Sequence, residues 1–392
     1  MARRRPLQSR PRRRQRRLVV EGLEGRRLLA ANVAVAADAS PNATSLVRLI
    51  DAETGAEVAS VTAFDAAYRG GIRLAMGHLT GNAAADVVAV PGSGLPGEVR
   101  VFKPVTSGGA TTLTQVLSFT PFGPGYRGGC EVAVGDVDGD GTEDIVVSKC
   151  REGGDVKVFR VTNPGGTPTA TLYATIAKPF GATTNGGSTV GVADVGEFTN
   201  GAFVKSVGDN KVEILVGSGA GLAAQVKVYD VSRAAAPRVA DTIVPAFQGF
   251  QGQPFAGGVW ATSGRYSASG VTDSIDDIVV SAGRGGSGAA QTIVYDGKVS
   301  PAANTVLKSF GTYGPSQRPN AAVFAAAADA DGNGQVDRFL VTQGDPGGPA
   351  GIASVSIAGA KSATPVTSLV GPLRIAAPRT VFQPQTINGT VA

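Results

Sequence analysis

A single segment type recurs along this 392-residue chain and limits the folds open to it. Each copy contains an aromatic residue, usually a Gly-Gly pair, an apolar run, a polar loop and a second apolar run. The glycine pairs stand at 70–71, 128–129, 186–187 and 257–258. A glycine-rich turn and a strand-like segment of alternating apolar and polar residues follow, as at 99–102. Such alternation indicates one buried and one exposed face, so we interpret each unit as four antiparallel strands.

Tandem units of four strands are typical of a β-propeller. We therefore predict an all-β fold, a β-propeller of four-stranded antiparallel blades. Five full units fit between about residues 56 and 358, and the two ends of the chain are expected to supply a sixth. Six blades is the expected number, with five and seven as alternatives.

The expected sixth blade combines segments from both ends of the chain. Its predicted third and fourth strands are residues 32–36 and 46–50, and its first and second are 367–370 and 373–376. Joining the two ends closes the ring and removes its free sheet edges. On this interpretation the propeller covers residues 32–380, an Arg-rich leader occupies 1–31, and a tail occupies 381–392.

The most acidic loop has the spacing of a calcium ligand set. Asp136, Asp138, Asp140 and Asp144 take positions 1, 3, 5 and 9, with glycine at positions 4 and 6. Calcium takes about 6 to 8 oxygen ligands, and carboxylates this close repel unless a cation lies between them. Thr142 can add its backbone carbonyl. The flanks are strand-like, so we expect a Ca²⁺-binding hairpin tip; the alternative is a solvated Asp/Gly turn without metal.

A second copy of this loop spans residues 329–337, where asparagine replaces the aspartate at position 5. Its expected Ca²⁺ ligands are Asp329, Asp331, Asn333, Gln335 and Asp337. It has one negative charge fewer, so we expect weaker binding. The copy that ends at Asp86 and the copies near 194 and 263 have lost most ligands, and we expect them to be structural.

The pattern resembles the FG-GAP repeat, also called the VCBS repeat, of integrin α-chain propellers and many exported bacterial proteins. The matching residues are Phe122, Tyr126, Gly128-Gly129, the run from Val134 to Gly141, and the run from Asp144 to Val147. The resemblance covers roughly residues 32–380. It implies a propeller with calcium-bearing hairpins that binds a protein or glycan at a cell surface or in a matrix, without specifying the ligand.

The positive charge of the chain is concentrated in its leader. The formal net charge is +5, and residues 1–30 contribute eleven arginines against Glu21 and Glu24, which leaves −4 for the remainder. We therefore expect no nucleic-acid partner for the folded part. No apolar run approaches the roughly 18 residues of a membrane helix, so no membrane span is expected.

The leader itself suggests export. Residues 16–30 resemble an N-terminal segment of large exported bacterial repeat proteins, with a Leu-Glu-x-Arg-x-Leu-Leu core, which implies a secreted or cell-surface location. Residues 28–36 can alternatively serve as a short apolar signal core with cleavage after Ala39, which would remove the strand at 33–36. We favour the strand.

Cys130 and Cys150 lie symmetrically about Asp140 in the calcium hairpin. In an antiparallel register that pairs 134 with 146, the two cysteines face each other across the strands. We predict a disulfide between them, which fits an oxidising exterior. The alternative is two buried thiols.

Other chemistry is poorly represented. His78 is the only histidine, and we expect a structural role in a turn rather than a Ser-His-Asp triad or a zinc site. The glycine-rich segment 217–221 precedes a strand rather than a helix, so it is not a phosphate loop. Trp260, the only tryptophan, is expected in a strand core. We therefore predict a non-enzymatic binding module; the alternatives are a polysaccharide lyase or hydrolase with a Tyr, Lys or Arg base, or a structural envelope component.

Overall fold

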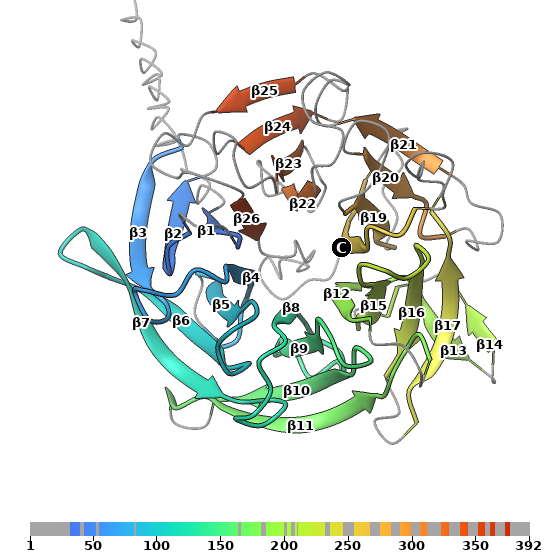
Figure 1. Cartoon of the computed structure of the whole chain (residues 1–392), viewed down its shortest axis with the longest axis horizontal. Coiled ribbons are helices and arrows are strands. Elements are labelled where there is room, and N and C mark those ends of the chain that lie inside the picture. The colour runs from blue at the N-terminus through green and yellow to red at the C-terminus, as the bar shows by residue number, and fades with distance from the viewer. Residues whose placement is uncertain are drawn as a thin grey trace, which may run out of the picture.

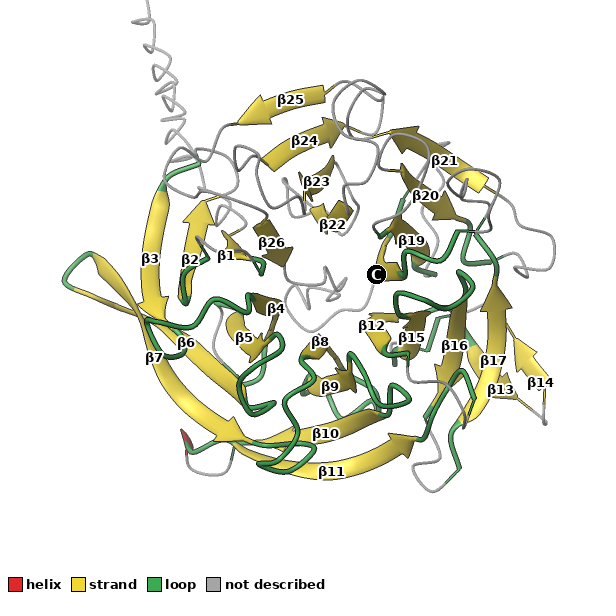
Figure 2. Ribbon diagram, viewed as in Figure 1, coloured by secondary structure: helices red, strands yellow, loops and turns green. Residues whose placement is uncertain are grey.

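The computed structural model is an all-β propeller in which strands and connecting loops are arranged around a central axis (Figure 2). It describes residues 32–39, 43–51, 55–81, 84–163, 166–181, 186–199, 202–204, 208–209, 211–231, 236–245, 255–266, 275–283, 291–298, 306–311, 323–328, 338–343, 352–356, 361–364 and 373–376. Within these ranges no helix is long and apolar enough to cross a membrane.

Five blades each come from one continuous stretch of the chain (Figure 1). Blade I contains β4 (Ile72–Gly77), β5 (Asp86–Pro91), β6 (Val99–Ser107) and β7 (Ala110–Phe119). Blade II contains β8 (Cys130–Gly135), β9 (Asp144–Lys149), β10 (Val156–Thr162) and β11 (Thr169–Ile176). Blade III contains β12 (Ser188–Ala193), β15 (Glu213–Ser218), β16 (Val226–Asp230) and β17 (Arg238–Ile243), with a small hairpin, β13 (Glu197–Thr199) and β14 (Ala202–Val204), inserted after β12.

The remaining continuous blades complete this series. Blade IV contains β18 (Val259–Gly264), β19 (Asp277–Ala282), β20 (Gln291–Tyr295) and β21 (Val306–Gly311). Blade V contains β22 (Val323–Ala328), β23 (Arg338–Gln343), β24 (Ile352–Ser356) and β25 (Lys361–Thr364). In every blade the first strand lies nearest the axis and the last lies at the rim (Figure 1). The predicted all-β propeller of four-stranded antiparallel blades is confirmed, but with five blades, the alternative number, and not the expected six.

A further four-stranded sheet is composite, because it joins strands from opposite ends of the described chain. Its order is β26 (Leu373–Ala376), β1 (Asn32–Ala37), β2 (Leu46–Asp51) and β3 (Glu57–Thr62). β26 pairs antiparallel with β1, with Ala34 opposite Ala376. The predicted division into two strands from each end is wrong: three come from the N-terminal side. The predicted strand at 367–370 lies outside the described residues.

This arrangement also corrects the boundaries of the repeat. The predicted unit grouped each rim strand with the loop hairpin that follows it in the chain. In the structure a rim strand such as β3 pairs with the strand before it, so each blade begins one strand later. Sequence periodicity gives the length of a repeat but not its starting point, and only the strand pairing decides between the two groupings.

A β-bulge recurs between the third and fourth strands of five sheets. The register shifts at Leu49/Ile50, Val101/Phe102, Val158/Phe159, Val228/Tyr229 and Val294/Tyr295. In four of these sheets the extra residue on the rim strand packs against the core: Val58, Val116, Tyr173 and Ala240. A bulge bends its strand and increases the local twist. Here it turns an apolar side chain inwards on a strand whose outer edge faces solvent.

The hydrophobic core lies between adjacent sheets rather than at the axis. One cluster joins the composite sheet to blade I, through residues such as Leu49 and Ile72. Equivalent clusters join blades I and II, II and III, and III and IV. An inner strand is therefore covered on both faces, which explains why every residue of β8 is buried.

The second glycine of a pair permits this close packing. Gly129 has φ +87°, a conformation that favours glycine. A Cβ atom on Gly129 would lie 2.9 Å from the backbone nitrogen of Ser93, in the preceding blade. The Gly129 carbonyl also accepts a hydrogen bond from the Cys150 N–H at 2.9 Å. The glycine thus fixes where an inner strand starts and how near the axis it begins.

Candidate metal centre

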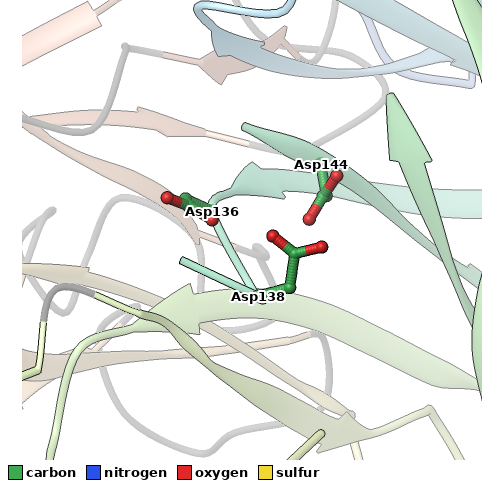
Figure 3. Close-up of side chains that lie close together, drawn as sticks. All are labelled: Asp136, Asp138 and Asp144. Carbon is green, nitrogen blue, oxygen red and sulfur yellow. The ribbon is translucent and has the colours of Figure 1, made fainter. Parts of the chain in front are cut away.

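The acidic loop of blade II connects β8 to β9 at one end of the hairpin. Gly135 pairs with Asp144, so the loop consists of residues 136–143. Asp136, Asp138 and Asp144 each offer a carboxylate oxygen, and these oxygens lie within 4.8 Å of one another (Figure 3). Among the residues that the structure describes, no other three acidic, histidine or cysteine side chains come together in this way.

Asp136 organises the backbone of the loop. Its Oδ1 accepts a hydrogen bond from the Gly139 N–H at 2.7 Å, and its Oδ2 accepts one from the Gly141 N–H at 2.9 Å. Both glycines have positive φ, +79° and +85°. Glycine adopts such backbone angles without strain, so these two residues allow the loop to reverse sharply.

Asp144 is buried at the start of β9 and is held by two backbone groups. Its Oδ1 accepts from the Val161 N–H at 3.0 Å, and its Oδ2 accepts from the Val137 N–H at 3.4 Å. These bonds tie the loop to β10. Asp144 therefore has a structural task in addition to any role as a ligand.

The same structural task recurs where the other carboxylates have been lost. Buried acids begin the second strand of blades I, III and IV: Asp86, Glu213 and Asp277. They accept hydrogen bonds from loop N–H groups of Leu79 and Thr80, Val195, and Tyr266, respectively. The spacing of the loop predicted only that this acid is a ligand or the remnant of one. An acid remains at this position of the sequence in loops that have lost the other ligands, and this recurrence indicates that the acid anchors the loop.

Burial and mutual repulsion disfavour the charged carboxylates. Burial raises the pKa of Asp136, and the charges of Asp138 and Asp140 raise it further. Burial, with a smaller contribution from the charge of Asp138, raises the pKa of Asp144 to about 7. A divalent cation among these oxygens would reverse both effects, because it favours the ionised form.

One cation from the protein already contacts the cluster. The Arg160 guanidinium of β10 forms an ion pair with Asp138 Oδ2. The same guanidinium lies over the Tyr173 ring, 4.7 Å from its centroid. Tyr173 is the bulge residue of β11, so the bulge helps to position Arg160. Arg160 was not predicted from the sequence, because it lies outside the loop, on the third strand of the blade.

The remaining predicted ligands are placed differently. Asp140 is exposed and lies outside the group of three; its Oδ1 accepts from the Thr142 N–H at 2.8 Å. The second predicted set, residues 329–337, lies outside the described residues. His78 belongs to the adjacent loop of blade I, where its N–H donates to Glu143 Oε2 and its Nδ1 lies 3.7 Å from that oxygen.

The predicted disulfide is not found. The register pairs Val134 with Ile145 and Cys130 with Lys149, one residue away from the predicted register. Cys150 therefore lies beyond the end of β9 instead of opposite Cys130, and no disulfide joins the two residues. A shift of one residue moves a side chain to the other face of a strand. Burial raises the pKa of the Cys130 thiol.

No protein-family model matches this chain, and no curated protein sequence matches it. A protein of Lactobacillus plantarum has a similar structure at TM-score 0.47 and 14% identity, covering 88% of this chain and 82% of that chain. Sqt1 of Chaetomium thermophilum, bound to the N-terminus of the ribosomal protein L10, has TM-score 0.40 and 12% identity, covering 88% and 77%. A rhamnogalacturonan lyase of Bacillus licheniformis has TM-score 0.37 and 14% identity, covering 89% and 69%. Similarity at this level carries no argument about function.

Proposed function

We propose that this chain is an exported, calcium-binding propeller of the FG-GAP/VCBS type that acts as a non-enzymatic binding module for a protein or glycan. The observation that carries the metal assignment is the convergence of Asp136, Asp138 and Asp144 in a loop where burial and like charge raise carboxyl pKa values. Fixed carboxylates in such a place suit a hard cation with oxygen ligands.

Calcium in this proposal is structural. When bound, it supplies positive charge that offsets the repulsion among the three carboxylates. Asp140 and the Thr142 carbonyl are further candidate ligands from the same loop. The loop already holds Asp136 and Asp144 through backbone hydrogen bonds, so part of the site is organised in advance. Residues 329–337 are proposed as a second, weaker site.

Thermal unfolding with and without calcium tests this role. Ligand at 100 times its Kd stabilises the native state by about 2.7 kcal/mol. We expect excess chelator to lower the Tm by several degrees and calcium to restore it. Asp138→Asn should remove most of this response, whereas Glu152→Gln, a charge change at an exposed side chain of the same blade, should retain it. An unchanged Tm under saturating chelator would refute the calcium role.

We also propose that the composite sheet closes the ring. Its second strand, β1, is followed by Asp38, which forms an isolated bridge with Gly71 of blade I. Arg151, after the second strand of blade II, forms the same kind of bridge with Gly186 of blade III. The composite sheet thus meets its neighbour in the manner of a continuous blade.

Export and the absence of catalysis are proposed from the sequence. The leader at residues 16–30 supports a secreted or cell-surface location, and detection of the chain only inside the source cell would contradict it.

The non-enzymatic role is tested by incubating the protein with acidic polysaccharides, where release of unsaturated or reducing ends would favour a lyase or hydrolase. Retention in an insoluble envelope fraction without any soluble ligand would instead favour a structural component.

A further inference from the structure

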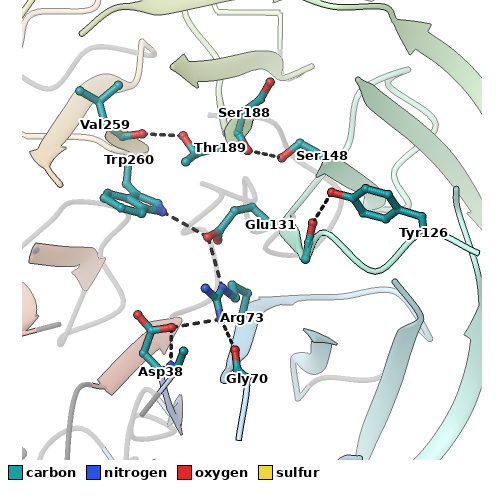
Figure 4. Close-up of polar contacts among 12 residues, drawn as sticks. Asp38, Gly70, Arg73, Tyr126, Glu131, Ser148, Ser188, Thr189, Val259 and Trp260 are labelled. Carbon is teal, nitrogen blue, oxygen red and sulfur yellow. Dashed lines mark hydrogen bonds and ion pairs between the residues drawn. The ribbon is translucent and has the colours of Figure 1, made fainter. Parts of the chain in front are cut away.

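The inner strands of four blades each carry a side chain at the equivalent position next to the axis. Arg73, Glu131, Thr189 and Trp260 are each the second residue of their strands, β4, β8, β12 and β18, and each follows a Gly-Gly pair by two residues. The four strands are the innermost of blades I to IV (Figure 1). Figure 4 shows Arg73, Glu131 and Trp260 directed towards one another.

This position differs from the residue that follows it in how it varies between blades. The next residue along the same strands is always apolar: Leu74, Val132, Val190 and Ala261. The axial position instead carries a cation, an anion, a hydroxyl and an indole. A side chain needed only to hold the ring together would be expected to recur, as the apolar residues do. The divergence indicates an asymmetric demand at the axis, such as a bound molecule.

The contacts across the axis join three blades. Arg73 is held firmly on one side, where Nη1 lies 3.0 Å from Asp38 Oδ1 and donates to the Gly70 carbonyl at 3.2 Å. Glu131 Oε1 accepts from Arg73 Nε and from Trp260 Nε1, both at 3.4 Å. These two bonds are long for N–H···O hydrogen bonds. Glu131 therefore links blade I to blade IV through two long contacts.

Trp260 is positioned for contact and not only for packing. The sequence predicted this residue within a strand core; it lies in β18, but it is partly exposed and its indole N–H reaches Glu131 of blade II. Gly283 makes room for the ring, since a Cβ atom there would lie 2.7 Å from Trp260 Cζ3. Thr189 Oγ1 donates to the Val259 carbonyl at 2.6 Å and so fixes the start of the same strand.

We infer that Arg73, Glu131 and Trp260 form an axial binding site for a neutral saccharide. An aromatic surface can pack against the C–H groups of a sugar ring, while a carboxylate and a guanidinium supply an acceptor and donors for its hydroxyl groups. Asp38, Arg73 and Glu131 together carry one net negative charge, which disfavours uronates and phosphates. This inference rests on the proposed binding role and narrows its ligand to one class.

The single tryptophan provides a direct test. Trp260 is the only tryptophan among 392 residues, so tryptophan emission reports on this position alone. Neutral oligosaccharides of glucose, galactose, mannose and rhamnose would be titrated into the full chain, with oligogalacturonate and a basic peptide in parallel. We expect a saturable change in emission with at least one neutral saccharide and none with oligogalacturonate. Glu131→Gln should weaken that binding at least tenfold, and Glu152→Gln should not.

Calorimetry measures saccharide binding to a Trp260→Phe variant, which has no tryptophan emission. Circular dichroism checks that each variant is folded. The inference is overturned if no neutral saccharide changes the emission at millimolar concentration, or if only the uronate or the peptide does. Equal affinity of a folded Glu131→Gln variant would also overturn it. Glycan binding that survives both Glu131→Gln and Trp260→Phe would leave the binding role intact and refute the axial site alone.

Discussion

At the scale of single residues, the candidate metal centre combines a loop organised by its own side chains with a competing cation. Asp136 and Asp144 hold loop backbone, and Asp138 is paired with Arg160. Calcium must either displace this guanidinium or share Asp138 with it. Arg160 is therefore expected to set the calcium affinity of blade II.

Replacement of Arg160 tests this competition. Arg160→Gln removes a positive charge adjacent to the site, so calcium should bind more tightly, by roughly 3- to 10-fold for a partly exposed charge. Arg160→Lys keeps the charge and should stay near the wild-type affinity. Isothermal titration calorimetry measures both. Equal affinity of Arg160→Gln and wild type would show that Arg160 does not compete.

Glu213 gives a pH dependence that is independent of the metal centre. Burial raises its pKa well above 4.5, its ordinary value. The native state therefore keeps the proton at pH values where the unfolded chain has lost it, and stability falls as pH rises from about 4.5 through the raised pKa. Glu213→Gln cannot lose this proton. Its free energy of unfolding should decline less than that of wild type between pH 5 and pH 8, measured by urea unfolding with chelator present. Parallel pH profiles would contradict this.

At the scale of strands and loops, two recurring features of the repeat contact each other: a cation on the third strand of a blade and the aromatic residue that precedes the first strand. Lys157 of β10 donates to the Pro121 carbonyl at 2.9 Å and lies 5.4 Å from the Phe122 ring centroid. The equivalent cations Arg100 and Lys227 make the same two contacts, to Ala63 and Phe64 and to Pro179 and Phe180. The third strand of each of these blades thus binds the segment that connects the blade to the preceding sheet.

Lys157→Met measures the strength of this contact. The substitution keeps an apolar stem but loses a cation–π contact and a hydrogen bond, each worth about 0.5 to 1.5 kcal/mol. We expect the free energy of unfolding to fall by about 1 to 2 kcal/mol, whereas Lys298→Met, at an exposed lysine, should change it little. A Lys157→Met variant as stable as wild type would mean that the packed blades alone fix the connection.

At the scale of the whole molecule, the sequence predicted the class of fold and the acidic hairpin but not the strand grouping. The alternation of apolar and polar residues, the glycine pairs and the spacing of the aspartates are local signals. They predicted the four-stranded blades and the position of the acidic loop. Blade boundaries and the Cys130 register depend on which strands pair, and a one-residue difference decides them. Arg160 contacts the acidic loop from a separate strand, and Glu131 contacts Trp260 between two blades, so the sequence alone could not show these contacts.

Deletion of β26 tests ring closure. Removing residues 365–392 leaves β1 as an unpaired edge, and exposed edges promote instability and association. We expect a lower Tm and self-association in light scattering, relative to a control that lacks only residues 381–392. If the two truncated chains melt and sediment alike, the composite sheet does not close the ring.

The central claim is that Asp136, Asp138 and Asp144 hold a calcium ion. Diffraction from crystals grown in calcium chloride tests it most directly, because the ion scatters strongly and its bonds to carboxylate oxygens are about 2.3–2.6 Å long. We predict an ion bonded to an oxygen of each of the three residues, with Arg160 moved away from Asp138. A calcium-soaked crystal in which Arg160 stays on Asp138 and only water lies between the carboxylates would contradict the account.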